Sequence, residues 1–126
     1  MTPQEYLQAS ARTMDGSTYR FSTTNGMTPD IEHAIIGIVD EAGELAKVIK
    51  HVKIYNQELD TTNLVEEAGD IMWYLALLCR TLGVSFEEVW DKNIRKLQAR
   101  YPEKYTEQKA KEANRNRQKE REQLEK

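Results

Sequence analysis

The sequence predicts an all-α protein, an antiparallel bundle of about four helices whose core is completed by oligomerisation, followed by a charged C-terminal tail. Three observations support this fold class. Apolar residues recur at the spacing of a helix face in residues 31–53 and 64–82, capping residues precede several segments, and no segment shows the alternation of a strand. A chain of 126 residues is long enough for one compact domain.

The first predicted element is a short helix that begins at Pro3. Thr2 supplies the capping hydroxyl, Pro3 fits the first helical position, and Glu5 completes a capping box. Residues 15–26 are rich in Gly, Asn, Ser and Thr, which favour turns, so we expect a loop there.

The second predicted element is a long core helix. Thr28 and Pro29 open it, and the apolar residues of positions 31–53 fall on one wide face. A loop is expected around residues 54–62.

The third predicted helix spans residues 64–82, with Asn63 as its N-cap. It is apolar nearly all round from residue 71 to residue 79, so we expect it to be the most enclosed helix. Gly83 should end it.

A shorter helix is predicted from Phe86 to about Arg100, capped by Ser85 and ended by Pro102. Residues 1–102 should therefore form one domain and residues 103–126 a charged extension, whose acids and bases are interspersed. We expect that extension to be a solvated helix or a disordered tail, with an interaction arm as the alternative.

Composition excludes several classes of partner. A net charge of -3 gives no basic face for nucleic acid, and no window is apolar enough for a membrane span. The N-terminus lacks the pattern of a signal peptide. Cys79, the single cysteine, lies in an apolar run and is predicted to be a buried hydrophobe in a reducing compartment. We expect a soluble cytoplasmic protein.

Two similar tetrapeptides place acids inside the core helices. EAGE puts Glu41 and Glu44 on one helix face, and EAGD does the same for Glu67 and Asp70. In an antiparallel hairpin, facing residues have a constant sum of residue numbers, and that sum is the same for Glu41 with Asp70 as for Glu44 with Glu67. One register therefore brings all four carboxylates together, although a loop centred near residue 58 would offset the pairs by about one turn.

Such a cluster requires cations, because four neighbouring carboxylates repel one another. All-oxygen ligation suits Mg²⁺, with Mn²⁺ as a substitute, and Mg²⁺ sites commonly contact substrate phosphates. Gly43 and Gly69 interrupt the two helices, and we expect their bare backbone to let the facing helix or a metal approach closely.

Two alternative interpretations concern the acids. A carboxylate-bridged di-iron bundle needs two Glu-x-x-His motifs, and that pattern fails because His33 follows Asp30 and His51 follows Val48. His51 is therefore interpreted as a surface residue. The second alternative is a non-catalytic helical interaction module whose acids face solvent.

The motifs together resemble those of the MazG-like members of the all-α nucleoside triphosphate pyrophosphohydrolase superfamily. DEAGE (40–44) and EAGD (67–70) are similar to the family's E-E-x-x-E and E-x-x-D, and NIRKLQARYP (93–102) is similar to its downstream Asn, Lys and Arg-Tyr-Pro. TPQEYLQASART resembles the first helix of small, often phage-encoded members. The resemblance spans residues 2 to about 105.

The resemblance implies roles for individual residues. The implied Mg²⁺ ligands, which are also the catalytic carboxylates, are Glu41, Glu44, Glu67 and Asp70. The triphosphate would be held by Asn93, Lys96, Arg100 and Tyr101, with Lys96 also catalytic and with Lys47 and Trp73 as further substrate-binding candidates. Further candidates for reading the base are Tyr6, Arg20, Phe21 and His33. The sequence departs from the family pattern at Asp40, where the family has Glu, which leaves the four ligands intact.

The reaction implied by the resemblance is Mg²⁺-dependent hydrolysis of nucleoside or deoxynucleoside triphosphates between the α and β phosphates. The products would be a nucleoside monophosphate and pyrophosphate, and the role would be nucleotide-pool control or house-cleaning. Homodimers or dimers of dimers are implied as well.

Overall fold

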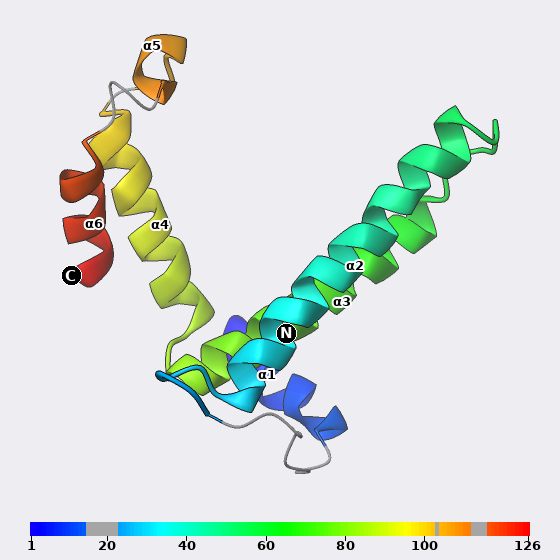
Figure 1. Cartoon of the computed structure of the whole chain (residues 1–126), viewed down its shortest axis with the longest axis horizontal. Coiled ribbons are helices and arrows are strands. Elements are labelled where there is room, and N and C mark those ends of the chain that lie inside the picture. The colour runs from blue at the N-terminus through cyan, green and yellow to red at the C-terminus, as the bar shows by residue number, and fades with distance from the viewer. Residues whose placement is uncertain (15–22, 103, 112–115) are drawn as a thin grey trace. The chain divides into compact units, whose positions relative to one another are not determined.

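The computed structural model describes residues 1–14, 23–102, 104–111 and 116–126. Across these ranges the regular structure is helical, and the one β-type feature is an isolated bridge between Thr24 and Met27, so the all-α prediction is confirmed. The chain divides into two compact units, Met1–Val84 and Ser85–Lys126, which are described separately; Figure 1 labels their helices. No helix in the described ranges combines the length and apolar character needed to cross a bilayer.

The first unit opens with α1 (Pro3–Ser10), continued by the 3-10 turn η1 (Ala11–Thr13). The predicted capping box is present, since Glu5 N–H donates to Thr2 Oγ1 at 3.2 Å and Thr2 N–H donates to Glu5 Oε2 at 2.6 Å. Of the loop predicted at residues 15–26, the structure describes only the part from residue 23, where Asn25 and Gly26 adopt positive φ.

Helix α2 (Pro29–Lys53) begins as predicted, with the Thr28 hydroxyl accepting from Ile31 N–H at 3.3 Å. Helix α3 (Thr61–Leu82) begins earlier than predicted, because its N-cap is Asp60 and not Asn63. Asp60 Oδ1 accepts from two backbone N–H groups at 3.0 Å each. One carboxylate thus satisfies two orphan donors and also interacts favourably with the helix dipole. Gly83 ends α3 at φ 68°, as predicted.

Helices α2 and α3 lie side by side as an antiparallel hairpin, and α1 packs on α3 (Figure 1). The buried apolar side chains of this unit are Leu7, Ala34, Val48, Ala76, Leu77 and Cys79. Arg80 links α1 to α3, since its Nη1 donates to Leu7 O at 2.9 Å and to Ser10 Oγ. A cation at the C-terminal end of α1 also interacts favourably with that helix dipole.

The glycine that lets the two long helices approach is Gly37. It is buried, and a Cβ at this position would overlap the ring of Tyr74. Gly43 and Gly69 have open space where a Cβ would lie. The expectation that these two glycines bring the facing helices together is therefore wrong; both lie on exposed sides of their helices.

Both core helices keep an exposed apolar stripe. Along α2, Ile35, Val39 and Ile49 are 45%, 69% and 65% exposed. Along α3 the corresponding residues are Val65, Met72, Leu75 and Leu82. Within each helix these residues are separated by three or four positions, or by sums of such steps. This spacing places them on one face of the helix. In the single chain the inner side of α3 is therefore buried and its outer side is exposed, and the expectation that α3 is the most enclosed helix stays a prediction.

The second unit contains α4 (Phe86–Arg100), α5 (Glu107–Ala110) and α6 (Arg117–Glu125). The limits of α4 match the prediction, and the Ser85 hydroxyl accepts from Glu88 N–H at 3.1 Å. Helix α6 packs beside α4 (Figure 1). The charged extension, expected to be a solvated helix or a disordered tail, therefore includes a helix, and Glu120 of that helix is buried.

Candidate metal centre

Three of the four predicted carboxylates lie together in the first unit. One carboxylate oxygen from each of Glu41, Glu67 and Asp70 can be chosen so that all lie within 4.8 Å of one another. Glu67 and Asp70 share a face of α3 because they are three residues apart, and α2 presents Glu41 to them. Glu41 and Glu67 are half-buried, whereas Asp70 is exposed.

The register of the hairpin explains why these acids meet. Gly37 faces Tyr74, and their residue numbers have the same sum as those of Glu41 and Asp70. The observed loop between α2 and α3 does not offset the acids by a turn, because this glycine–aromatic contact holds the register.

Glu44 lies outside the cluster of three. Its Oε1 accepts a hydrogen bond from Lys47 Nζ at 2.5 Å, one helical turn further along α2. This hydrogen bond is the main reason why the pKa of Lys47 is raised. The predicted ligand Glu44 and the predicted phosphate-binding residue Lys47 are thus paired with each other.

The cluster carries electrostatic strain in the absence of a cation. Desolvation raises the pKa of Glu41, and the charges of Asp70, Glu67, Asp40 and Glu44 raise it further. A raised carboxyl pKa means that the surroundings disfavour the charged form. A divalent cation held by these oxygens would reverse that preference.

Asn63 and Tyr6 make hydrogen bonds beside the acid cluster, and the sequence motifs predict neither contact. Asn63 Nδ2 donates to Glu67 Oε1 at 2.9 Å, which orients that carboxylate. Tyr6 O–H donates to Gly69 O at 3.4 Å, and its pKa is raised by burial and then by Asp70. The spacing of Asn63 and Glu67, four residues apart on one helix, is the signal that could have indicated the first contact.

Trp73 is tied to the N-terminal segment. Its Nε1 lies 2.9 Å from both Ser10 O and Thr13 Oγ1 and donates toward them. Its ring also meets Tyr74 edge to face at a centroid distance of 4.9 Å, and His33 contacts both rings. One aromatic group is therefore formed by Trp73, Tyr74 and His33. The role of Trp73 in binding a nucleotide base stays a prediction. Arg20 and Phe21 lie outside the described residues.

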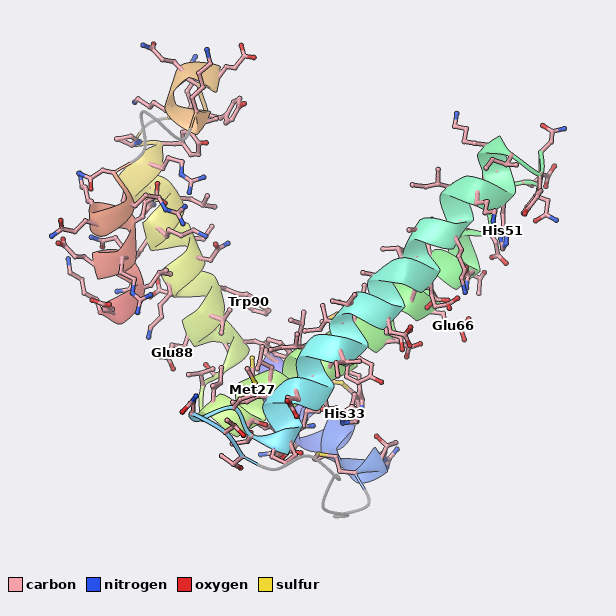
Figure 2. The ribbon with its side chains drawn as sticks, viewed as in Figure 1. Met27, His33, His51, Glu66, Glu88 and Trp90 are labelled. Atoms are coloured by element: carbon pink, nitrogen blue, oxygen red, sulfur yellow. The ribbon has the colours of Figure 1, made fainter. Side chains whose placement is uncertain are left out.

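The two histidines lie near opposite ends of α2 (Figure 2). His51 is exposed, as predicted, and lines a cavity of about 460 Å³ at the loop end of the hairpin. This cavity is also lined by Asn63 and Glu66. The separation of the histidines agrees with the failure of the di-iron pattern.

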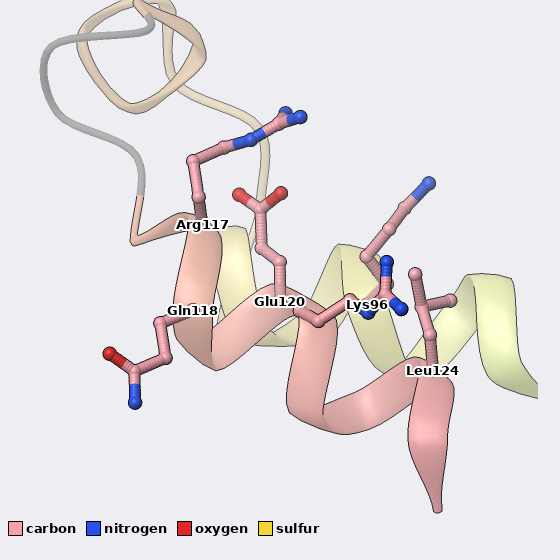
Figure 3. A pocket seen from close by; sticks show the side chains of 6 residues that line it. Lys96, Arg117, Gln118, Glu120 and Leu124 are labelled. Carbon is pink, nitrogen blue, oxygen red and sulfur yellow. The ribbon is translucent and has the colours of Figure 1, made fainter.

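The predicted triphosphate-binding residues belong to the second unit. Lys96 lines a cavity of about 520 Å³ between α4 and α6, together with Arg117, Arg121 and Leu124 (Figure 3). Arg100 is bound by Glu120 of α6. Asn93 is exposed on α4, and Tyr101 is the residue that ends it.

Comparisons with known proteins place this chain in a family. The profile of the MazG nucleotide pyrophosphohydrolase domain matches residues 30–105, which include the acid cluster and all of α4. Gene 37 protein of Mycobacterium phage L5 is 36% identical over 75 residues, covering 56% of this chain and 65% of that protein.

A second relative, the uncharacterized protein YpjD of Bacillus subtilis (strain 168), is 31% identical over 72 residues, covering 55% of this chain and 65% of its own length. The chain thus spans slightly less than two thirds of each of these relatives. No solved structure matches it significantly. Because the family profile covers more than half of the sequence, the chain belongs to the MazG nucleotide pyrophosphohydrolase domain family.

Proposed function

We propose that the protein hydrolyses nucleoside or deoxynucleoside triphosphates between the α and β phosphates, with Mg²⁺ as the cofactor and Mn²⁺ as a substitute. The observation that carries the proposal is the meeting of Glu41, Glu67 and Asp70 from two helices within 4.8 Å. The donor set fits the ion, because it contains carboxylate oxygens and no histidine or cysteine.

Within this proposal the first unit holds the ion. Glu41, Glu67 and Asp70 are the ligands available in the described arrangement, and Glu44 would join them once Lys47 turns to the substrate. Asn63 holds Glu67 in orientation through its side-chain amide. When bound, Mg²⁺ would activate a water and offset charge on the phosphates.

The second unit supplies cations for the leaving pyrophosphate. Lys96 and Arg100 would take up its charge, while Asn93 and Tyr101 would complete the contacts to the triphosphate. Most of the rate acceleration then comes from positioning and charge stabilisation, as is general for phosphoryl transfer. Trp73 is the proposed platform for the base.

The oligomer in this proposal is a homodimer or a dimer of dimers. Its support is the exposed apolar stripe on each of α2 and α3, which a second copy would bury as a four-helix core. The remaining partner is the nucleotide substrate, in a cytoplasmic setting without nucleic acid.

The test is a screen of the canonical ribo- and deoxyribonucleoside triphosphates for pyrophosphate release with Mg²⁺. We expect at least one substrate, with pyrophosphate and not orthophosphate as the product. Glu67→Gln should abolish turnover, and Glu66→Gln, the neighbouring exposed carboxylate, should retain it. Release of orthophosphate, or equal turnover by both variants, would contradict the proposal.

A further inference from the structure

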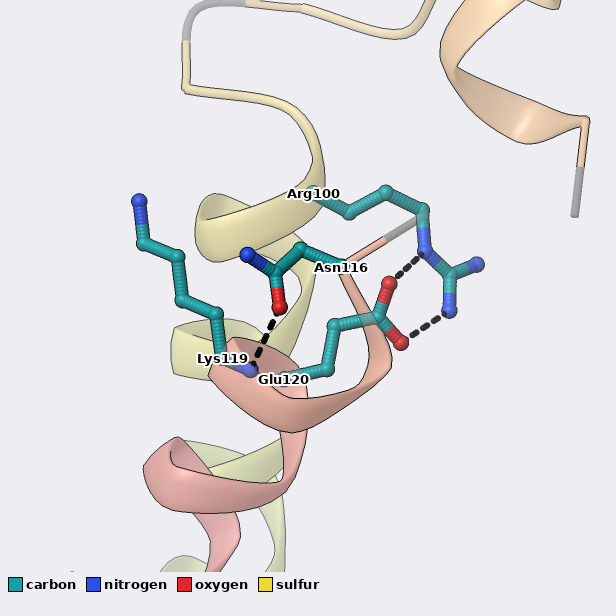
Figure 4. Close-up of polar contacts among 4 residues, drawn as sticks. All are labelled: Arg100, Asn116, Lys119 and Glu120. Atoms are coloured by element: carbon teal, nitrogen blue, oxygen red, sulfur yellow. Dashed lines mark hydrogen bonds and ion pairs between the residues drawn. The ribbon is translucent and has the colours of Figure 1, made fainter. Parts of the chain in front are cut away.

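The contact that carries a further inference joins α6 to the end of α4. Arg100 Nε donates to Glu120 Oε1 and Arg100 Nη2 donates to Glu120 Oε2, each at 2.8 Å (Figure 4). The two side chains are largely buried, with 16% and 6% of their surfaces exposed. A bidentate guanidinium–carboxylate pair of this kind is among the strongest polar contacts that proteins make.

Glu120 differs from its neighbours on α6. Arg117, Gln118, Lys119, Arg121 and Glu122 are all exposed, whereas Glu120 is buried. Asn116 sets the start of the helix, because its Oδ1 accepts from Lys119 N–H at 2.9 Å (Figure 4). Glu120 is thus the buried carboxylate through which α6 binds Arg100 of α4.

The geometry of this pair is also that of a guanidinium holding a phosphate. A phosphate held by two of its oxygens along the Nε–Nη2 edge of Arg100 would take the edge that Glu120 occupies. If a phosphate took that edge while α6 stayed docked, the buried Glu120 carboxylate would lie beside the phosphate, and the repulsion between these two negative groups is unfavourable. Docked α6 and a phosphate on the Nε–Nη2 edge of Arg100 therefore exclude each other.

We propose that α6 is an autoinhibitory latch, in which Glu120 occupies the edge of Arg100 that the substrate triphosphate would use. The proposal rests on the proposed function through the role of Arg100. Docking of α6 brings no net positive charge to compensate, because its three basic residues are balanced by three acidic ones. Substrate then binds only the fraction of molecules whose α6 is released, so the apparent affinity falls by that fraction.

The main test compares Glu120→Gln with Glu122→Gln in the full chain, using inorganic tripolyphosphate as the probe. Both substitutions remove one negative charge from α6, but Glu122 is exposed and bonded within its own helix to Gln118. Titration calorimetry should show tripolyphosphate binding tightened about 5- to 30-fold in Glu120→Gln, because α6 is released more often once the charged contact to Arg100 is removed. Glu122→Gln should bind like the unmodified protein.

Asn116→Ala provides a second variant that leaves both members of the pair intact. Loss of the N-cap weakens α6, so binding should tighten in the same direction by a smaller factor. In the unmodified protein, saturating tripolyphosphate should also speed tryptic cleavage after Arg117, Lys119 and Arg121, because release exposes that segment.

The outcomes separate this proposal from the proposed function. Unchanged or weakened tripolyphosphate binding in Glu120→Gln, or protection of α6 from trypsin by the ligand, would overturn the latch even if pyrophosphate release is found. Weakened binding would mean instead that α6 completes the anion site through the cavity that it shares with Lys96. Tightened binding and ligand-enhanced cleavage without turnover of any nucleotide would support the latch and reject the enzymatic proposal.

Discussion

Gly37 on α2 lies against the ring of Tyr74 on α3, with no room for a Cβ between them. This contact holds the hairpin in the register that brings Glu41 to Asp70. Tyr74 has little freedom to move aside, because its ring also contacts Trp73 and His33 edge to face. The geometry of the acid cluster thus depends on a glycine about one helical turn away from Glu41.

Gly37→Ala should therefore destabilise the protein. Overpacking of a filled site lowers the free energy of unfolding by about 1–3 kcal/mol, outweighing the better helix propensity of Ala. Denaturant unfolding with and without Mg²⁺ measures both this loss and the expected weakening of metal binding.

The matched control is Gly43→Ala, since a Cβ there meets nothing within 4 Å in the described structure. It should raise the free energy of unfolding by about 0.5–1 kcal/mol through helix propensity. If Gly37→Ala proved as stable as Gly43→Ala, the glycine–aromatic contact would not be holding the register.

Glu41→Gln should have opposite effects with and without metal. The raised pKa of Glu41 means that its charged form is disfavoured in the metal-free fold, by burial first and by the neighbouring acids second. Removing that charge at pH 7 should raise the metal-free midpoint of thermal unfolding slightly, by about 1–3 °C. The upward shift that 5–10 mM Mg²⁺ gives the unmodified protein, expected of any site that binds metal only when folded, should be lost.

The comparison for this experiment is Glu66→Gln, which removes an exposed carboxylate next to the cluster. Differential scanning fluorimetry in EDTA and in Mg²⁺ gives both midpoints. If neither Mg²⁺ nor Mn²⁺ shifted the unfolding midpoint of the unmodified protein, the result would favour the hypothesis of a non-catalytic interaction module.

Ile49→Glu should dissociate the proposed oligomer. Ile49 is 65% exposed and belongs to the apolar stripe of α2, so a second copy would bury it. Losing the burial of one isoleucine side chain at the interface should weaken self-association by about tenfold or more. Light scattering at micromolar concentration should give a dimer or larger mass for the unmodified protein and a smaller mass for the variant.

Ile54→Glu is the matched control, because Ile54 is 68% exposed but lies at the end of α2, outside the stripe. Its mass should equal that of the unmodified protein. A monomeric mass for the unmodified protein would reject the oligomer, and loss of mass in both variants would reject the assignment of the stripe as the interface.

Cys79 should be poorly reactive while the protein is folded. Burial raises the pKa of its thiol, and Arg80 opposes this effect only as a secondary cause. Ellman's reagent at pH 8 should therefore label the native protein slowly and the guanidinium-unfolded protein fast, because the thiolate is the reactive form.

The same shift has a defined sign in stability. A thiol whose pKa is higher in the folded than in the unfolded state stabilises the fold below the unfolded value, near 8.5, and this contribution is lost as pH rises through the folded value. The free energy of unfolding should fall between pH 8 and 10 by at most about 1.4 kcal/mol per pH unit from this group. Cys79→Ala should lack that component of the slope, and an equal slope in both proteins would assign the pH dependence to other groups.

The sequence by itself determined the helices wherever the signal is local. Thr2, Thr28 and Ser85 cap the next few backbone N–H groups, and Gly83 can adopt positive φ at the end of α3, so neighbours along the chain suffice to predict these boundaries. The repeated acid motif likewise indicated four carboxylates as one group, of which the structure brings Glu41, Glu67 and Asp70 together. Asn63 was misassigned because Asp60 also has a capping side chain and begins the helix three residues earlier, where it accepts from the N–H groups of Thr62 and Asn63.

Only the tertiary structure decided which glycine the helices close on and which charged partners pair. Gly37, Gly43 and Gly69 are alike as sequence, but only Gly37 faces an aromatic ring. Glu120 is buried on Arg100, 20 residues earlier in the chain, whereas the pairing of Glu44 with Lys47 is local to one helix. Such choices depend on which groups the packed helices bring within a few ångströms, and residues far apart in the chain give no local signal of that distance.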